Sequence, residues 1–389
     1  MQLALALLTA ALVSLTPRPV VPGAGTWIAF VPLLVALLRT RHPLAGFGVG
    51  WVAGLGAGIV AFEGVAPVEL VAYPILVILT AVPSGIMAML VVLLRRHRGE
   101  AAALLAFPAL LVAATYLPAQ RWLLGPFADT VSSVATTQVD TPLRFVAAWS
   151  GGSAIVLLVG VLNVAIFALV TRRAVFASLL AIVVTFGVAF LPVPGRAVPS
   201  AEGATLTVAI AQGAVPSIES LLAFFGDDAA DRVLAPYVEL TRAAAEREAD
   251  LVVWGETVLP RPLTPGELPP ALAEALAGAP TVLAGGISFV RPDTFNAIFH
   301  WSDGLLTEVY RKRALVPLNE RQYTPGVALP PLDVEGVGVG LGICLDSVVP
   351  TLARDAVVRG AQMLVYLTDD AFAGRTVMPI MHLRHTVLR

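Results

Sequence analysis

Lysine and cysteine are almost missing from this sequence of 389 residues. It contains one lysine, Lys312, and one cysteine, Cys344. A single cysteine excludes a disulfide bond within the chain, so the cysteine count does not indicate a redox compartment. Because all other strongly basic side chains are arginine, the lysine at position 312 indicates a site that needs a compact ammonium group rather than a planar guanidinium.

Charged residues are scarce as well. They make up 13% of the chain, hydrophobic residues make up 57%, and the mean hydropathy is +0.82. Soluble domains carry roughly a quarter charged residues, so much of this chain is expected in a membrane. Residues 1–200 hold 11 basic and 5 acidic side chains, whereas residues 201–389 hold 14 basic and 22 acidic ones. This asymmetry predicts two domains, one in lipid and one in water. Neither half has a basic patch, so no nucleic acid partner is expected.

Seven apolar stretches have the composition of membrane helices. The first has no basic residue before it, so we interpret it as a short membrane helix, with an uncleaved signal anchor as the alternative. We therefore expect residues 1–192 to form a polytopic α-helical membrane domain of about seven helices, at residues 1–15, 26–38, 44–62, 67–94, 101–117, 152–170 and 174–191.

The loops between these stretches predict the topology. Arginines gather in alternate loops, at residues 39–41, 95–98 and 172–173. Positive loops face the cytoplasm, so the N-terminus lies there too, and an odd number of spans places everything after Leu191 on the outer face of the membrane. The segment 118–151 falls on the same side, either at the interface or as an ordinary loop with Trp149 as an anchor.

The second half has the pattern of a layered α/β domain at residues 204–389, after a linker at residues 193–203 that opens with Pro-Gly punctuation. Short strand-like runs alternate there with amphipathic stretches. We expect strands at residues 206–212, 251–254, 281–289, 296–302, 305–311, 337–343 and 363–368, and helices at residues 227–248, 267–277, 349–359 and 376–388.

Three candidate catalytic side chains follow strand-like runs. Glu256 comes after residues 251–255, Lys312 after residues 306–311, and Cys344 after residues 337–343. Layered α/β folds gather catalytic groups at strand ends. A glutamate can take the proton of a thiol, and a lysine can hold the negative oxygen of a tetrahedral intermediate, so the set is sufficient for acyl transfer through a thioester. Taken singly, Cys344 also fits a buried apolar position, Glu256 a cap and Lys312 a solvated basic patch.

No cofactor or metal ion is expected. The alternating glycines at residues 336–340 lie within a strand-like run rather than after it, unlike those of a dinucleotide-binding loop. His382 and His385 are spaced i, i+3 with no third ligand nearby, so we assign them a packing or interface role.

Four segments resemble apolipoprotein N-acyltransferases, which are membrane-embedded members of the nitrilase superfamily. Residues 251–260 resemble the Trp-Pro-Glu-Thr segment of that family, and residues 310–320 are similar to its Tyr-x-Lys-x-x-Leu-Val-Pro-Phe-Gly-Glu block. Residues 343–346 stand where the family has Ile-Cys-Tyr-Glu, and residues 209–213 resemble its opening Val-Gln-Gly strand.

The resemblance implies a nitrilase-like αββα (carbon–nitrogen hydrolase) domain on the outer face of a bacterial inner membrane. Glu256 would be the general base, Lys312 the oxyanion-stabilising cation and Cys344 the acylated nucleophile, with Glu320 and Asp346 as supporting carboxylates. The implied reaction moves a fatty acyl chain from a phospholipid, through a Cys344 thioester, to the α-amino group of the diacylglyceryl-cysteine that begins an apolipoprotein.

The chain also departs from the family pattern. Leu345 and Asp346 replace Tyr and Glu, the segment between Glu320 and Cys344 is short, and Asp369 replaces an Asn, where it is expected to add negative charge near the thiolate. The sequence stops at Arg389, so we expect an incomplete nitrilase-like domain, either a fragment or one completed by a partner.

Three other functions stay open. One is a membrane-anchored nitrilase-type amidase or hydrolase, in which water resolves the acyl-cysteine. The second is a catalytically degenerate homologue that binds lipid or lipoprotein. The third is a transporter with a soluble appendage, for which only Glu63 and Glu69 offer ionisable groups near the apolar stretches.

Overall fold

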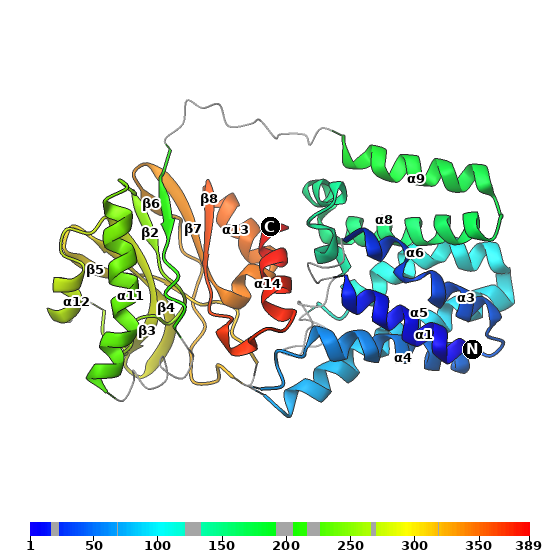
Figure 1. Cartoon of the computed structure of the whole chain (residues 1–389), viewed down its shortest axis with the longest axis horizontal. Coiled ribbons are helices and arrows are strands. Elements are labelled where there is room, and N and C mark those ends of the chain that lie inside the picture. The colour runs from blue at the N-terminus through cyan, green and yellow to red at the C-terminus, as the bar shows by residue number, and fades with distance from the viewer. Residues whose placement is uncertain are drawn as a thin grey trace. The chain divides into compact units, whose positions relative to one another are not determined.

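The computed structural model describes residues 1–16, 23–67, 69–120, 134–191, 205–215, 226–265, 270–317 and 319–389. The chain divides into two compact units, one of Met1–Arg196 with Ala373–Leu388 and one of Ala197–Phe372 with Arg389. Figure 1 labels the longer helices and most strands of both units. The predicted linker at residues 193–203 lies outside the described residues, as do residues 121–133 of the predicted interfacial segment.

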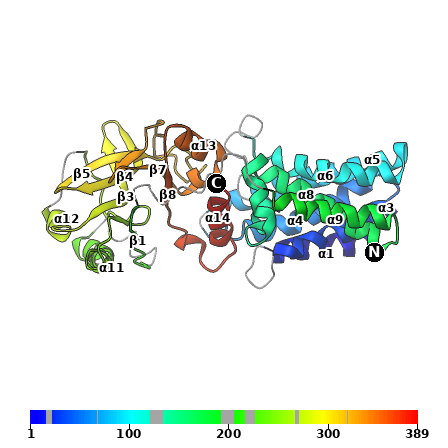
Figure 2. The same ribbon diagram turned by 90° about the horizontal axis from the view of Figure 1, so that it is seen from above.

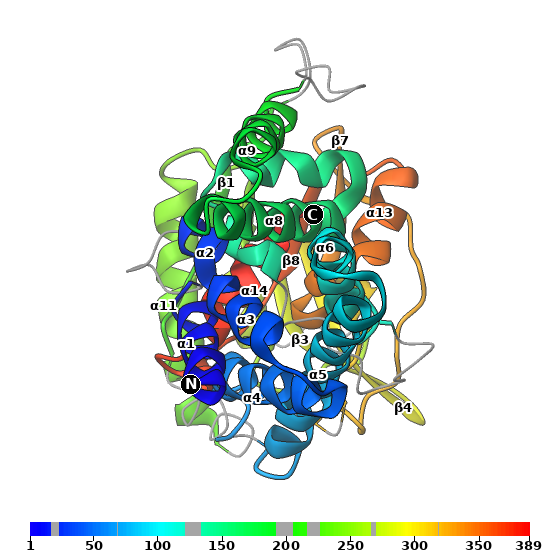
Figure 3. The same ribbon diagram turned by 90° about the vertical axis from the view of Figure 1, so that its right-hand side faces the viewer.

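The first unit is helical. Its described elements are α1 (Gln2–Leu15), η1 (Gly23–Gly25), α2 (Thr26–Ala29), α3 (Val31–Arg39), α4 (Pro43–Ala61), α5 (Ala72–Arg98), α6 (Glu100–Tyr116), η3 (Val134–Gln138), η4 (Pro142–Val146), α8 (Ala147–Val170), α9 (Val175–Ala189) and α14 (Met378–Val387). Figure 3 shows α3 surrounded by α1, α4, α5, α6 and α8. Leu33, Leu34 and Leu37 on α3 are buried there.

Three segments of the described chain are long and apolar enough to cross a membrane: Pro43–Ala61, Ala72–Arg98 and Pro142–Val170. Four shorter apolar helical segments occupy the other predicted places: Gln2–Leu15, Gly23–Arg39, Glu100–Tyr116 and Val175–Ala189. The predicted number of about seven spanning helices is therefore not confirmed. A helix rises ~1.5 Å per residue, so the 14 residues of α1 reach less than the ~30 Å of a hydrocarbon core.

Buried polar side chains and small residues hold the first unit together. The helical segment is interrupted between α2 and α3 at Phe30. The backbone N–H of Phe30 donates to Asn163 Oδ1 at 2.8 Å. Asn163 Nδ2 also donates to the carbonyl of Thr26 at 2.9 Å. Gly50 lets α4 approach α5 closely, because a Cβ there would lie 2.4 Å from the carbonyl oxygen of Ser84.

Helix α14 belongs to the first unit by its contacts, although the sequence predicts a single second domain of residues 204–389. Glu63 Oε1 accepts the backbone N–H of Val377 at 3.0 Å, just before the helix. Within it, Arg384 forms an ion pair with Asp140 at 2.6 Å. These long-range polar contacts join residues 373–388 to residues 1–196, and sequence periodicity has no means of predicting them.

The second unit contains two sheets. One has the order β1-β2-β3-β4-β5, with β1, β2 and β3 parallel and β3, β4 and β5 antiparallel. The other has the order β6-β7-β8, with β6 antiparallel and β8 parallel to β7. The strands are β1 (Val208–Ile210), β2 (Leu251–Val253), β3 (Thr281–Val290), β4 (Asp293–Ser302), β5 (Leu305–Arg311), β6 (Leu332–Val334), β7 (Val337–Ile343) and β8 (Met363–Leu367), and the helices are α11 (Asp227–Ala245), α12 (Pro270–Ala275) and α13 (Pro350–Val358).

Two hydrophobic cores order these elements into layers, as Figure 2 shows. One core packs Val252 and Phe299 of the first sheet against Tyr237 of α11 and Leu276 near α12. The other packs the opposite face of the first sheet against the second sheet, through a cluster of Leu251, Val253, Leu283, Ile298, Val339, Ile343 and Leu367. Since α13 contacts β7, the layers run helix, sheet, sheet, helix, in the predicted αββα order.

Candidate active site

The predicted catalytic residues follow the ends of three strands, and these strand ends lie close together. β2 ends three residues before Glu256, β5 ends immediately before Lys312, and β7 ends immediately before Cys344. The first two strands belong to one sheet and the third to the other. Because the two sheets share a core, their strand ends meet, and side chains far apart in sequence come together.

A buried lysine lies between two glutamates. Lys312 is 1% exposed, and its Nζ lies 3.1 Å from Glu256 Oε1 and 2.8 Å from Glu320 Oε1. Asn296 of β4 joins the same two oxygens, since its Nδ2 donates to Glu256 at 2.8 Å and to Glu320 at 3.1 Å. A buried lysine is tolerated only when it is paired, so this network explains why the lysine can be buried.

The turn after β2 holds Glu256 in place. Thr257 adopts a positive φ of 49°, which reverses the chain just after the glutamate. Gly285 of β3 is required here, because a Cβ would lie 2.5 Å from the carbonyl oxygen of Gly255 and 2.7 Å from the Cα of Glu256. The second carboxylate oxygen of Glu256 accepts the backbone N–H of Asp369 at 3.3 Å. Glu256 therefore has little freedom to move away from Lys312.

Lys312 stays protonated. Burial alone would lower its pKa, but the negative charges of Glu256 and Glu320, and that of Cys344 when its thiol is ionised, outweigh burial and raise the pKa above the ordinary lysine value. Glu320 is itself fixed by the turn that it closes, where its Oε2 accepts the backbone N–H of Val316 at 2.6 Å. The ammonium is thus a permanent positive charge at the site.

Cys344 lies on a strained turn. Its φ is 45°, in the left-handed region that side chains rarely adopt, and it opens the short 3-10 helix η5 (Cys344–Val348) directly after β7. Burial, Glu256, Asp370 and Glu320 raise the pKa of its thiol well above the usual value, and Lys312 partly opposes them. The thiol is therefore neutral at rest and needs a base before it can act as a nucleophile.

Asp346 ties the cysteine turn to the lysine segment. Its carboxylate accepts the hydroxyl of Tyr310 at 2.9 Å and the backbone N–H groups of Ile343 at 3.0 Å and Ala314 at 2.7 Å. Burial raises the pKa of Asp346, and these hydrogen bonds oppose that rise. The shorter side chain that replaces the family glutamate still reaches partners on both segments.

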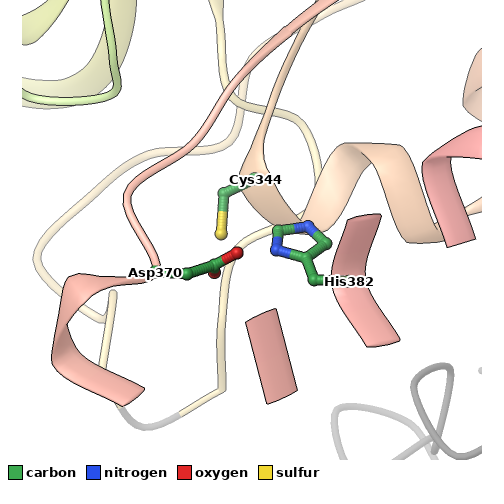
Figure 4. A group of neighbouring side chains, drawn as sticks. All are labelled: Cys344, Asp370 and His382. Atoms are coloured by element: carbon green, nitrogen blue, oxygen red, sulfur yellow. The ribbon is translucent and has the colours of Figure 1, made fainter. Parts of the chain in front are cut away.

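The expected charge near the thiol comes from Asp370 rather than Asp369. The Asp369 side chain turns back to accept the backbone N–H of Ala371 at 2.9 Å. A carboxylate oxygen of Asp370 lies within 4.8 Å of the Cys344 sulfur, and Figure 4 shows the two groups directed toward each other. The backbone direction at the end of β8 decides which of the two aspartates faces the sulfur, and a sequence motif does not reveal that direction.

Sequence analysis missed Asn296, Tyr310 and Asp370 as parts of the site. Asn296 is 2% exposed and lies in the buried run 295–299 of β4, which is otherwise apolar. A polar residue in such a run is the signal that could have found it. Tyr310 belongs to the segment at residues 310–320, but sequence alone does not reveal that its hydroxyl donates to Asp346. His382 and His385 are buried in α14, and the packing or interface role assigned to them stays a prediction.

Comparison with known families gives a match in each half of the chain. Residues 207–386 match the carbon-nitrogen hydrolase family, and residues 9–165 match the apolipoprotein N-acyltransferase N-terminal domain. Together the two matches cover both halves of the chain and support its assignment to the apolipoprotein N-acyltransferase family. This confirms the resemblance seen in the motifs and the nitrilase-like domain in the second half. Together with the apolar helices, the N-terminal match identifies a membrane protein.

Two similar proteins are named apolipoprotein N-acyltransferase. The apolipoprotein N-acyltransferase of Geobacter metallireducens is 26% identical over 429 residues, which cover 95% of this chain and 78% of that protein. That of Shewanella oneidensis is 24% identical over 324 residues, covering 74% of this chain and 60% of that protein. A solved carbon-nitrogen hydrolase from Helicobacter pylori G27 aligns with a TM-score of 0.29 at 21% identity, over 36% of this chain and 55% of that one, a similarity too low to support an inference.

Proposed function

We propose that this chain is an apolipoprotein N-acyltransferase that works through Glu256, Lys312 and Cys344. The acyl donor is a phospholipid, and the acceptor is the α-amino group of the diacylglyceryl-cysteine that begins an apolipoprotein. The observation that carries this proposal is the buried Lys312, paired with two glutamates and adjacent in space to a strained cysteine. The names of its two relatives agree with it.

In the first step, Glu256 takes the thiol proton of Cys344, and the sulfur attacks the ester carbonyl of the phospholipid. The C–S bond forms, the carbonyl electrons move to oxygen, and the ammonium of Lys312 stabilises that oxyanion. When the tetrahedral intermediate collapses, the C–O bond breaks and Glu256 gives its proton to the leaving alkoxide of the lysophospholipid. The raised pKa of the thiol is the reason why a base is needed.

In the second step, the amine of the acceptor attacks the thioester carbonyl. The C–N bond forms, the C–S bond breaks, and one amine proton passes to Glu256, which returns it to the cysteine sulfur. Lys312 again stabilises the oxyanion. Glu320 supports both steps by holding Lys312 at 2.8 Å, and Asp346 supports them by joining the turn of Cys344 to the segment of Lys312.

The proposal includes the location of the protein and its domain limits. We assign residues 1–192 to a membrane domain of about seven helices in the bacterial inner membrane, residues 193–203 to a linker and residues 204–389 to a catalytic domain on the outer face. The support is the alternation of arginine-rich loops and the match of residues 9–165 to the N-terminal family domain. Because the proposed acyl donor is a lipid, an enzyme of this kind needs a domain in the membrane to reach it.

The test is acylation of Cys344. The purified full chain is incubated in micelles with a phospholipid that carries a labelled fatty acid, and protein-bound label is then released with neutral hydroxylamine, which cleaves thioesters. We expect label on the wild type and none on Cys344→Ser. Adding a diacylglyceryl-cysteine peptide should move the label to the peptide as an amide. A folded wild type that takes up no label would refute the proposal, and release of free fatty acid in place of the amide would indicate a hydrolase.

A further inference from the structure

The guanidinium of Arg389 lies against the turn that carries the candidate nucleophile, and the proposed mechanism gives it no role. Its Nε donates to the carbonyl oxygen of Ser347 at 3.2 Å, and its Nη2 donates to that of Val348 at 2.7 Å. These two carbonyl groups end the short helix η5, which Cys344 begins. Arg389 belongs to the same compact unit as the cysteine, so the contact lies within that unit.

An arginine suits this contact chemically. The last carbonyl groups of a helix have no partner within the helix, and a positive charge near them is favourable. Arginine presents its N–H groups as a rigid planar fork, so one side chain can donate to two successive carbonyl oxygens at once. Burial lowers the pKa of Arg389, but an arginine remains charged at neutral pH. Both hydrogen bonds therefore come from a permanent charge.

The cysteine turn needs to be held because Cys344 is strained. A residue with a φ of 45° keeps that conformation only where its surroundings fix it. Asp346 fixes the start of the turn, where its carboxylate accepts the backbone N–H of Ile343 at 3.0 Å. Arg389 fixes the end of the turn. Without this second contact the turn is free to relax toward ordinary φ values, and such a relaxation moves the cysteine sulfur.

We propose that Arg389 is a positioning residue for thioester formation: its two hydrogen bonds to the end of η5 keep Cys344 in the conformation from which the sulfur attacks the acyl donor. This inference rests on the proposed function. Arg389 acts through the backbone of η5, and the chemical steps stay with Glu256, Lys312 and Cys344.

The first test measures thioester formation by the full chain in single turnovers, at increasing phospholipid concentrations in micelles. A misplaced reacting group can cost about a hundredfold in rate. In Arg389→Ala we expect the maximal rate constant to fall about ten- to a hundredfold, with the phospholipid concentration at half-saturation unchanged. Arg389→Lys keeps the charge but loses the fork, so its rate constant should lie between the two. Guanidinium ion, added below denaturing concentrations, should restore part of the rate of Arg389→Ala.

The second test reads the turn itself by amide hydrogen exchange and needs no acyl transfer. The peptide of residues 343–349 includes the backbone N–H of Val349, which donates to the carbonyl oxygen of Asp346 at 3.2 Å. We expect faster exchange there in Arg389→Ala than in the wild type. Exchange in β3 should stay the same, which would exclude general unfolding.

Arg359→Gln is the matched control. It removes the same charge from the same unit, where Arg359 pairs with Asp355 at 3.0 Å. We expect this variant to keep the wild-type exchange of residues 343–349 and the wild-type rate of thioester formation.

The pH dependence of Cys344 alkylation separates positioning from a direct effect of charge on the thiol. The pKa of the thiol is set by burial and by the charges of Glu256, Lys312, Asp370 and Glu320. If Arg389 acted by favouring the thiolate, its removal would shift the alkylation profile to higher pH. A positioning role predicts no such shift.

Faster exchange in the turn together with slower thioester formation supports the inference. Unchanged exchange or an unchanged maximal rate constant in Arg389→Ala would overturn it, as would an alkylation profile moved to higher pH or an equal loss of rate in Arg359→Gln. All of these results leave the proposed function standing, because the wild type still forms the thioester. A wild type without a thioester refutes the proposed function and this inference together.

Discussion

Replacing Lys312 by methionine tests the central ion network most directly. The side chain is 1% exposed and lies 3.1 Å and 2.8 Å from two carboxylate oxygens. Methionine fills a similar volume but leaves Glu256 and Glu320 as two buried negative charges, joined only through Asn296. Removing one partner from a buried ion pair costs about 3–5 kcal/mol. For a domain of this size, 1 kcal/mol changes Tm by about 2–4 °C, so we expect a Tm lower by roughly 6–20 °C.

The single cysteine supplies the assay. A maleimide fluorophore that reacts with Cys344 as the second unit unfolds reports on this site alone, because the chain has no other thiol. The charge-matched control is Lys312→Met combined with Glu320→Gln, which removes one positive and one negative charge. We expect it to recover a large part of the lost Tm. A Tm decrease below ~3 °C for the single variant, or a double variant as unstable as the single one, would refute the view that Lys312 offsets two buried charges.

Two further predictions concern neighbouring groups. Asp346→Ala leaves the donors of Tyr310, Ile343 and Ala314 unsatisfied in a buried position. The same assay should therefore show a free energy of unfolding lower by about 3–5 kcal/mol, whereas Tyr310→Phe should lower it by only ~1 kcal/mol. Equal losses of unfolding free energy in the two variants would contradict this. Because burial and the nearby carboxylates raise the pKa of the Cys344 thiol well above its ordinary value, and because only the thiolate reacts, alkylation by iodoacetamide should be slow near neutral pH and should keep rising through the alkaline range. Glu256→Gln removes a neighbouring negative charge and so lowers the pKa of the thiol. It should speed alkylation at pH 8, although thioester formation falls by about 10²–10⁴-fold. A wild-type alkylation rate that levels off below pH 8 would contradict the raised pKa.

Local pattern was sufficient for most of the second unit. The expected strand at residues 337–343 coincides with β7 (Val337–Ile343), and the other expected strands overlap observed ones. The three-residue strand β6 (Leu332–Val334) was missed, because so short a run has no recognisable period. In the first unit the apolar stretches were correctly located, but apolar composition does not report length, and several helices are shorter than a span requires.

The sequence by itself determined which catalytic groups this protein has. It has one thiol and one ammonium, each directly after a strand-like run, and a glutamate that follows another strand-like run. It also determined that much of the chain needs a membrane, because so many apolar side chains cannot be exposed to water. The tertiary structure decided how these groups are connected. Strand order within the first sheet brings Asn296 between the glutamates. The packing of the two sheets joins Asp346 to the segment of Lys312, and the backbone after β8 turns Asp370 rather than Asp369 toward the sulfur. Hydrogen bonds between residues far apart in sequence depend on strand register and backbone direction, and neither is encoded in a local pattern.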